Sequence, residues 1–219
     1  HWITPDETLE DDLRNTVWKG HYLDRKVADI MMRVPYDREF SLKRDDVGLL
    51  VNELVYMTAP YQRERWQVVF NNKKLERVRT MAVFAYHPIG VEIDSMPAFY
   101  LTSAMGGRMR EKTHHYTTIY DAFDAMLKSD VDAIMGLRGQ TDWLLHSKGS
   151  KQYSKGSNGF PEMGKQQWDL GIAIKTDFRQ LGYEAGDVID AMIKSGEMEK
   201  LYNQCGMEYE LPGLYQDVK

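Results

Sequence analysis

Val131-Asp132-Ala133-Ile134-Met135-Gly136 is a run of small and apolar residues that is typical of a short buried strand. It follows residues 118–127, where apolar residues recur at helical spacing and predict an amphipathic helix. A second stretch of similar order, Val27-Ala28-Asp29-Ile30-Met31-Met32, follows another predicted helix over residues 6–18. Such a helix-to-strand unit also arises by chance in α/β proteins. Its repetition predicts two similar lobes, each with its own small sheet.

The rest of the chain also alternates between helix and strand signals. Ser95-Met96-Pro97 predicts the start of a helix that stops at Gly106-Gly107, because Ser caps helices and Pro is tolerated in their first turn. Thr58-Ala59-Pro60-Tyr61 predicts a turn. Further strands are expected at 27–35, 49–57, 66–70, either 80–86 or 89–93, 115–117 and 170–175, with helices at 73–78, 183–195 and 196–205, and loops at 36–48 and 147–164. This order predicts an α/β fold with largely parallel sheets.

The composition is that of an ordinary folded chain. Of its 219 residues 42% are hydrophobic and 28% charged, and the net charge of −5 lacks the basic excess of a nucleic-acid-binding protein. No apolar run approaches the roughly 20 residues that cross a bilayer. His114 and His115 are adjacent, so on a strand they would point to opposite faces and could not chelate one ion together. The single cysteine, Cys205, can form no disulfide within the chain, and we expect neither a metal nor a cofactor.

In their order and spacing these motifs resemble family 3 of the extracellular solute-binding proteins, from about Leu13 to Gly206. The motifs are Val27-Ala28-Asp29-Ile30-Met31, Thr58-Ala59-Pro60-Tyr61, Ile89-Gly90-Val91, the run from Tyr116 to Met126 with Val131-Asp132-Ala133-Ile134-Met135, and Gly171-Ile172-Ala173-Ile174-Lys175. The resemblance implies the two-lobed type II periplasmic binding protein fold. It also implies action in the periplasm, a small ligand captured between the lobes, and delivery to a membrane transporter by hinge closure.

The resemblance also implies a division of the chain. We expect lobe 1 over residues 1–78, lobe 2 over 79–175, and C-terminal helices that return across the hinge over 176–219. The first strand and helix of lobe 1 are expected to be missing, because His1-Trp2-Ile3 would be the end of the second strand. No signal peptide is visible, and the natural N-terminus is expected to have been removed.

Three stretches are closer to one subgroup, the solute-binding-like proteins encoded with quinoprotein (PQQ-dependent) alcohol dehydrogenases, including the J protein of methanol oxidation. These stretches are Arg14-Asn15-Thr16, Met32-Arg33-Val34-Pro35 and Trp168-Asp169-Leu170-Gly171-Ile172-Ala173. This similarity implies an alternative role as a periplasmic accessory protein that interacts with such a dehydrogenase. The charged insertion Ser41–Val47 has no counterpart in that subgroup.

In amino-acid-binding members of the family, an Arg just after the first-lobe strand grips the ligand carboxylate. Arg38 is the nearest match here, followed by Arg33, although the spacing is shorter. An acid past the second-lobe strand pairs with the ligand ammonium, but Gly136-Leu137-Arg138 holds that place. The departure predicts a small solute other than a standard amino acid (a small anion or an apolar ligand), or no ligand at all, with Arg138 as a candidate contact.

Other candidate ligand contacts come from residue type and position. Ser95 at a helix start could present backbone N–H groups to an anion or simply cap its helix. Tyr36, Tyr61 and Trp143 are candidates either for aromatic walls of the cleft or for the core, and Trp66 fits the core better. A few enzymes, such as cyclohexadienyl dehydratases, use this fold, but the sequence offers no paired acid and base. We therefore expect a binding protein and no catalytic residues.

Overall fold

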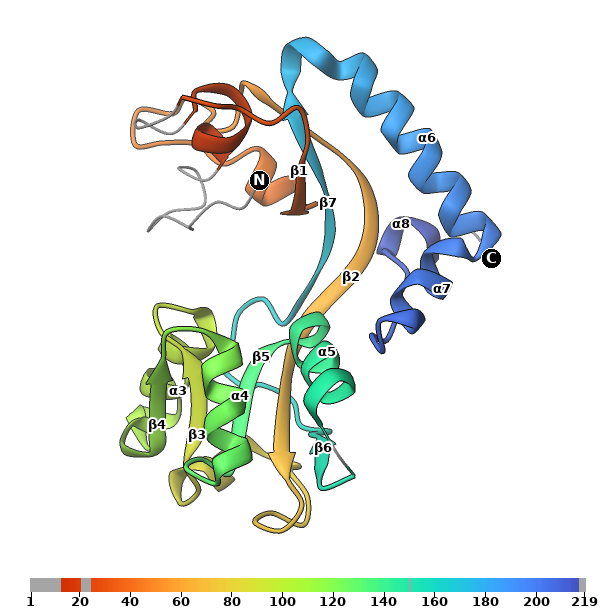
Figure 1. Ribbon diagram of the computed structural model, residues 1–219. Helices are drawn as coiled ribbons and strands as arrows, with labels where there is room; N and C mark the ends of the chain where they lie inside the picture. The colour runs from red at the N-terminus through yellow and green to blue at the C-terminus, as the bar shows by residue number, and fades with distance from the viewer. Residues whose placement is uncertain (1–12, 21–24, 150, 217–219) are drawn as a thin grey trace. The chain divides into compact units, whose positions relative to one another are not determined.

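The computed structural model describes residues 13–20, 25–149 and 151–216 (Figure 1). The predicted helix over residues 6–18 falls partly outside these ranges, and its described end is a π-helical turn, Arg14–Trp18. The chain forms two compact units. Unit 1 comprises residues 1–63, 168–201 and 209–219, and unit 2 comprises residues 64–167 and 202–208. These bounds differ from the lobes expected from the sequence, because the chain passes between the units inside its long second strand.

Unit 1 is built on strands from distant parts of the sequence. β1 (Met31–Pro35) pairs antiparallel with β7 (Gln167–Lys175), which neighbours β2 (Val55–Asn71) in the sheet order. The β1 register shifts between Met32 and Val34, where Arg33 adopts a φ of 64°. Val34, Leu13 and Ala173 form part of the core cluster beside this sheet.

The described residues of unit 1 include four α-helices, although the end of one belongs to unit 2. A four-residue helix, α2 (Arg38–Ser41), lies inside the predicted loop 36–48, and Asp37 caps it by accepting a hydrogen bond from the N–H of Phe40 at 3.0 Å. The predicted C-terminal helix pair is confirmed as α6 (Arg179–Ser195) and α7 (Glu197–Gln204). Gly196 separates them in the left-handed conformation, which glycine adopts without steric cost. The last helix is α8 (Gly213–Gln216).

Unit 2 is a mixed sheet covered on both faces. β5 (Ala133–Leu137) runs between β2 and β3 (Ile89–Glu92), and β4 (Thr113–Tyr116) lies at the far side of β3. β3 is parallel to β4 and β5, whereas β2 is antiparallel to β5 and to the short β6 (Tyr153–Lys155). The sheet is therefore mixed and not largely parallel, because the part of β2 in unit 2 runs against its neighbours.

Neighbouring residues on these strands enter different cores. Ile134 packs with α4 (Ile119–Lys128) and with Leu144 of α5 (Arg138–Lys148). Ala133 and Met135 face the opposite core, which contains α3 (Met96–Gly107) and the 3-10 turn Met81–Ala85. The alternation follows from the two-residue period of a strand and produces three layers, helix–sheet–helix. The separation of α3 from α4 by the sheet can be followed in Figure 1.

Among the predicted elements, the strand at 66–70 is confirmed as part of β2, whereas the turn at 58–61, which would separate it from a strand at 49–57, is wrong. β2 continues from Val55 to Asn71 through Pro60. Ala59 takes a φ of 50°, so the turn signal becomes a local distortion of a continuous strand. A Cβ added to Gly171 of β7 would lie 2.6 Å from the Thr58 carbonyl oxygen, so a glycine is required at this close approach. Burial of Ala59 and Tyr61 outweighs the local turn preference.

Other differences are smaller. Residues 73–78 form turns instead of a helix, and β6 lies within the predicted loop 147–164. The prediction contains no helix at α5. In contrast, α4, the strands at β3, β4, β5 and β7, and the Ser95 start of α3 are confirmed. Within the described ranges, no helix is long and apolar enough to cross a membrane.

Candidate functional site

The carboxyl ends of β3 and β5 meet the N-terminal ends of three helices in unit 2. β3 ends at Glu92 and is followed by α3, while β5 ends at Leu137 and is followed at once by α5. The first residue of α4 lies against the end of β5, since a Cβ added to Gly136 would come within 2.8 Å of Ile119 Cδ1. Ligands of open α/β sheets bind at such strand ends.

A cavity of about 130 Å³ occupies this place, and we call it the strand-end pocket. It is lined by residues from the strand ends, from the first turns of the helices, and from β2: Trp66, Glu92, Ser95, Pro97, Ile119, Met135, Gly136, Leu137 and Gln140. All of them belong to unit 2.

Glu92 is the charged residue of this lining and is half-buried. Its Oε2 atom accepts a hydrogen bond from the backbone N–H of Ile119 at 3.1 Å. The carboxylate therefore caps α4 from the neighbouring strand end. An acid at this position suits the positive end of the helix dipole.

Ser95 fixes the start of α3. Its hydroxyl accepts from the N–H of Ala98 at 3.3 Å and donates to the Glu92 carbonyl oxygen at 2.6 Å. Pro97 sits in the first helical turn, where the absence of a backbone N–H is tolerated. The hydroxyl thus links the end of β3 to the start of α3.

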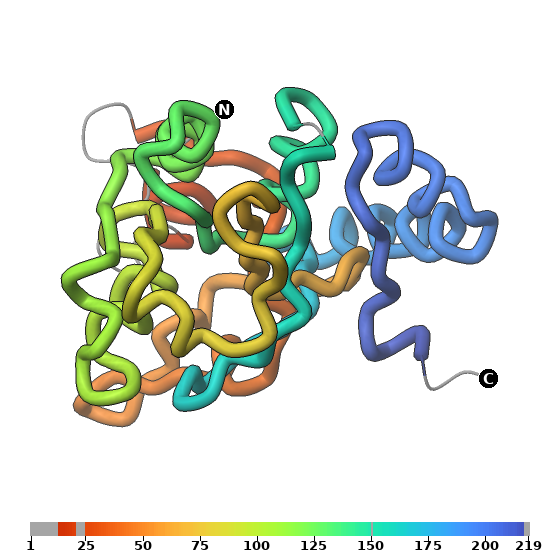
Figure 2. The backbone as a smooth tube through the Cα atoms, turned by 90° about the horizontal axis from the view of Figure 1, so that it is seen from below, coloured from red at the N-terminus to blue at the C-terminus, as the bar shows by residue number. Residues whose placement is uncertain are grey.

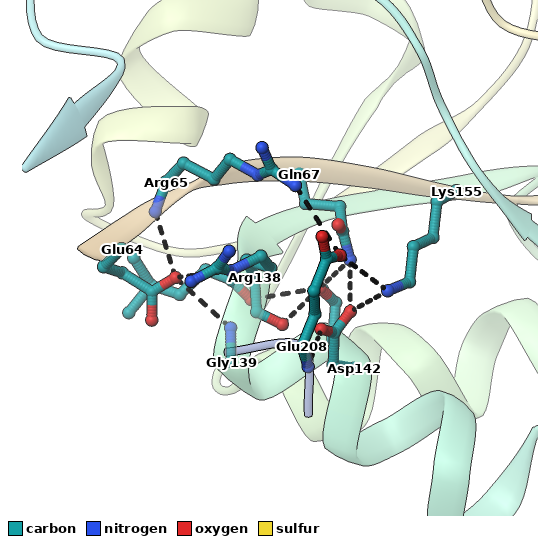
Figure 3. Close-up of polar contacts among 10 residues, drawn as sticks. Glu64, Arg65, Gln67, Arg138, Gly139, Asp142, Lys155 and Glu208 are labelled. Carbon is teal, nitrogen blue, oxygen red and sulfur yellow. Dashed lines mark hydrogen bonds and ion pairs between the residues drawn. The ribbon is translucent and has the colours of Figure 1, made fainter. Parts of the chain in front are cut away.

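α5 begins differently, because Leu137 at its N-cap position makes no side-chain capping bond. Glu64 of β2 provides the acceptor instead, and its Oε1 lies 3.3 Å from the N–H of Gly139 (Figure 3). The same oxygen lies 3.9 Å from Nε of Arg138. Both side chains are fully buried. The Arg138 guanidinium stands at the positive end of the α5 dipole, and the negative charge of the Glu64 carboxylate compensates this unfavourable position.

One turn further along α5, Asp142 collects three donors. Its Oδ1 accepts from Gln67 Nε2 and from Lys155 Nζ, each at 2.8 Å, and its Oδ2 accepts from the N–H of Glu208 at 3.0 Å. Glu208 ends the return segment, Tyr202–Glu208, in which the chain comes back to unit 2. This segment can be followed in dark blue in Figure 2, and its contact with Asp142 is drawn in Figure 3.

Of the ligand contacts predicted from the sequence, one lines the strand-end pocket and the others lie elsewhere in the two units. Ser95 lines the strand-end pocket, and so does Trp66, which also packs against the core as expected. Arg138 is fully buried and faces Glu64, and Trp143 is exposed on α5 with its ring 6.3 Å from that of His146. The residues lining this pocket include neither Arg138 nor Trp143.

Three predicted contacts lie in unit 1. Arg38 is exposed at the first position of α2, and Tyr36 is exposed beside β7, its N–H donating to the Asp169 carbonyl oxygen at 2.8 Å. Tyr61 is buried, and its hydroxyl accepts from the N–H of Arg33 at 3.1 Å, at the β1 bulge. Their role as ligand contacts stays a prediction.

Glu92 and Gln140 were missed by the sequence reasoning. Glu92 follows Ile89-Gly90-Val91, so an acid at the end of a predicted strand was a usable signal. Gln140 had none, because α5 itself was not predicted.

A larger hollow, of about 360 Å³, lies along β2 and the segment 156–167. Half of its lining residues carry amide or hydroxyl side chains, Arg65 is also part of the lining, and Gln67 and Gln166 already donate hydrogen bonds within the protein. The strand-end pocket is smaller but occupies the place where sheet topology puts ligands, so it is the candidate site. The described residues contain no group of three or more His, Cys, Asp or Glu that could hold a metal.

No protein-family model matches the chain, and neither does any curated protein sequence. Solved structures do match. A substrate-binding protein of an amino acid ABC transporter from Streptococcus pneumoniae, bound to L-arginine, aligns with a TM-score of 0.54 at 14% identity, over 70% of this chain and 61% of that one. An ancestral cationic amino acid solute-binding protein gives 0.62 at 14% identity, over 81% and 69%. The GluR0 ligand-binding core in complex with L-glutamate gives 0.57 at 11%, over 81% and 72%.

At such low identity the likeness concerns architecture. The chain spans roughly three fifths to three quarters of the length of the solved structures that it matches. These matches and the mixed open sheet agree with the α/β architecture predicted from the sequence. The chain has the fold of the two-lobed type II periplasmic binding proteins.

Proposed function

We propose that this chain is a solute-binding protein that captures a small polar solute, and that the strand-end pocket holds one end of the ligand. The observation that carries the proposal is the convergence of Glu92, Ser95 and Gln140 on a cavity at the strand ends. Further support comes from the matched structures, two of which are complexes with L-arginine and with L-glutamate. The proposed place of action is the periplasm, and the proposed partner is a membrane transporter.

The hydrogen bonds that Ser95 and Glu92 already make within the protein favour a binding role over a catalytic one. The Ser95 hydroxyl is engaged on both sides, donating to a carbonyl oxygen and accepting from a backbone N–H. Its proton is therefore directed at a backbone carbonyl oxygen, which does not activate the hydroxyl as a nucleophile. Glu92 is likewise held by a capping bond. Groups fixed in this way suit recognition, which benefits from preorganised contacts.

The test is a thermal-shift screen of the full chain against amino acids, small organic acids and polyamines. A solute that binds the native state raises the melting temperature in proportion to the logarithm of its concentration. The matched variants are Gln140→Trp, which fills the pocket, and Gln180→Trp on exposed α6. We expect a solute class that stabilises the parent and Gln180→Trp but not Gln140→Trp.

Two results would overturn the proposal. One is a solute that stabilises parent and Gln140→Trp equally. The other is a complete lack of stabilisation together with co-purification of a quinoprotein dehydrogenase, which would favour the accessory role that the sequence offers as the alternative.

A further inference from the structure

We infer that the ligand end held in the strand-end pocket is a small organic cation, an ammonium or guanidinium group, with Glu92 as its counterion. The inference rests on the proposed function and names the chemical class that this site selects. The arrangement of the elements alone would favour an anion, because three helix N-termini border the pocket and helix N-termini attract anions. The contacts of these helix ends favour a cation instead.

The N–H groups of α3 are largely occupied by its own residues. Ala98 donates to the Ser95 hydroxyl at 3.3 Å, and Phe99 donates to the Ser95 carbonyl oxygen at 3.1 Å. The residue between Met96 and Ala98 is Pro97, which has no N–H. A ligand anion at this helix end would therefore find few donors.

N–H groups at the starts of α4 and α5 are also hydrogen-bonded to acceptors of the protein. In α4, Ile119 donates to Glu92, and Asp121 donates to the Thr118 hydroxyl at 3.2 Å. In α5, Gly139 donates to the buried carboxylate of Glu64. At the start of α4, Glu92 is a full negative charge that opposes the approach of an anion, whereas at α5 the Glu64 carboxylate occupies the Gly139 N–H and is itself paired with Arg138.

Glu92 has capacity for a ligand besides its capping bond. A carboxylate offers two oxygens and about four acceptor positions, and the bond from Ile119 uses one of them. Among the described residues that line the pocket, Glu92 is the one with a formal charge. The rest of the wall is mostly apolar, which strengthens its attraction for an opposite charge.

The wall and size of the pocket fit a cationic end group. Trp66 is among the lining residues, and an indole ring attracts cations more strongly than neutral groups of the same shape. The volume of about 130 Å³ corresponds to roughly four water molecules, enough for a guanidinium or for an ammonium with its adjoining methylene groups.

The experiment compares two probes of the same shape. n-Butylguanidinium and n-butylurea differ in charge, and valerate supplies a short anion. Each is titrated by NMR into the full-length parent chain, into Glu92→Gln, and into Glu111→Gln, a charge-matched control at an exposed position. Gln at position 92 keeps an acceptor for Ile119, so α4 stays capped, and an unchanged melting temperature verifies this.

We expect the parent and Glu111→Gln to bind n-butylguanidinium about tenfold more tightly than n-butylurea, and valerate most weakly. In Glu92→Gln the preference for the cation should disappear. Equal or tighter binding of n-butylurea or valerate by the parent would overturn the inference, as would no binding of any probe or a preference that survives in Glu92→Gln. If the solute screen still finds a ligand whose binding Gln140→Trp abolishes, the proposed function stands and only the charge assignment fails.

Discussion

Glu64 and Arg138 face each other in the interior of unit 2, both fully buried, with Oε1 and Nε 3.9 Å apart. The two residues come from β2 and from the first position of α5 (Figure 3). Their pairing stabilises a helix start that has no side-chain cap of its own. Removal of one partner leaves the other charge uncompensated in the protein interior, where charges are costly.

Glu64→Ala is therefore expected to lower the free energy of unfolding by about 3–5 kcal/mol. Urea denaturation of the purified chain measures it. Glu111→Ala, at an exposed site, should change stability by no more than about 0.5 kcal/mol. The double variant Glu64→Leu, Arg138→Met should recover much of the loss, since a buried apolar pair needs no compensation. Equal effects of Glu64→Ala and Glu111→Ala would contradict this account.

Gly206→Ala should destabilise the return segment. Gly206 has a φ of 68°, and an added Cβ would overlap the ring of His146 on α5. Both effects act in the same direction, so we expect a loss of at least about 1 kcal/mol. Hydrogen exchange should show faster exchange at Glu208, whose N–H donates to Asp142. Gly159→Ala is the control, because nothing lies within 4 Å of its added Cβ. Equal exchange in the two variants would count against the docking described here.

Ser129→Gly should stabilise unit 2. Ser129 ends α4 in the left-handed conformation with a φ of 69°, which a side chain disfavours and glycine adopts freely. We expect a gain of about 0.5–1 kcal/mol in the free energy of unfolding. Ser157→Gly, at an exposed position without a positive φ, should be neutral or slightly destabilising. A loss of stability in Ser129→Gly would show that the serine makes a contact that outweighs the backbone preference.

Tyr100→Phe should change the response to alkaline pH. The Tyr100 hydroxyl is buried without a hydrogen-bond partner among the described residues, and burial, followed by the negative charge of Glu162, raises its pKa to about 12. The ordinary tyrosine pKa is about 10. Stability from this group is complete below pH 10 and is lost as the pH rises toward 12, because the unfolded chain releases the proton first.

The parent should therefore lose up to about 1.4 kcal/mol per pH unit from this residue between pH 10 and 12, and Tyr100→Phe should lack this component. At pH 7 the variant should be as stable as the parent or about 1 kcal/mol more stable, because an unsatisfied buried hydroxyl is removed. Urea denaturation at pH 7, 10 and 11 measures both effects. Tyr86→Phe, at a largely exposed position, serves as the control. An identical alkaline response of parent and Tyr100→Phe would refute the prediction.

The sequence predicted the helices of unit 2 whose capping residues lie next to them in the chain. Thr118 caps α4 through a capping box with Asp121, three residues further on, and Ser95 caps α3 in the same local manner. α5 could not be found in this way, because its cap is Glu64, which lies 75 residues before Gly139. A window of neighbouring residues contains no trace of such a cap.

The candidate site follows the same division. The helix start at Ser95 was predicted because a serine before a helix is a local pattern, whereas no local pattern indicates the contact of Arg138 with Glu64. The partner of Arg138 depends on which strand packs against the start of α5, and the tertiary structure determines this. The same holds for β2 in unit 1. The sequence around Pro60 favours a turn, but the burial of Ala59 and Tyr61 keeps the strand continuous.

The return segment has a consequence for the order in which the protein is made. Residues 64–167 leave the ribosome long before Tyr202–Glu208, yet Asp142 receives one of its three donors from Glu208. After Gln167, some 40 further residues, including α6, must be synthesised before Glu208 can complete the hydrogen bonds of Asp142. Its final consolidation is therefore coupled to completion of the chain, and a nascent chain halted before residue 208 carries a buried aspartate one hydrogen bond short of its native set.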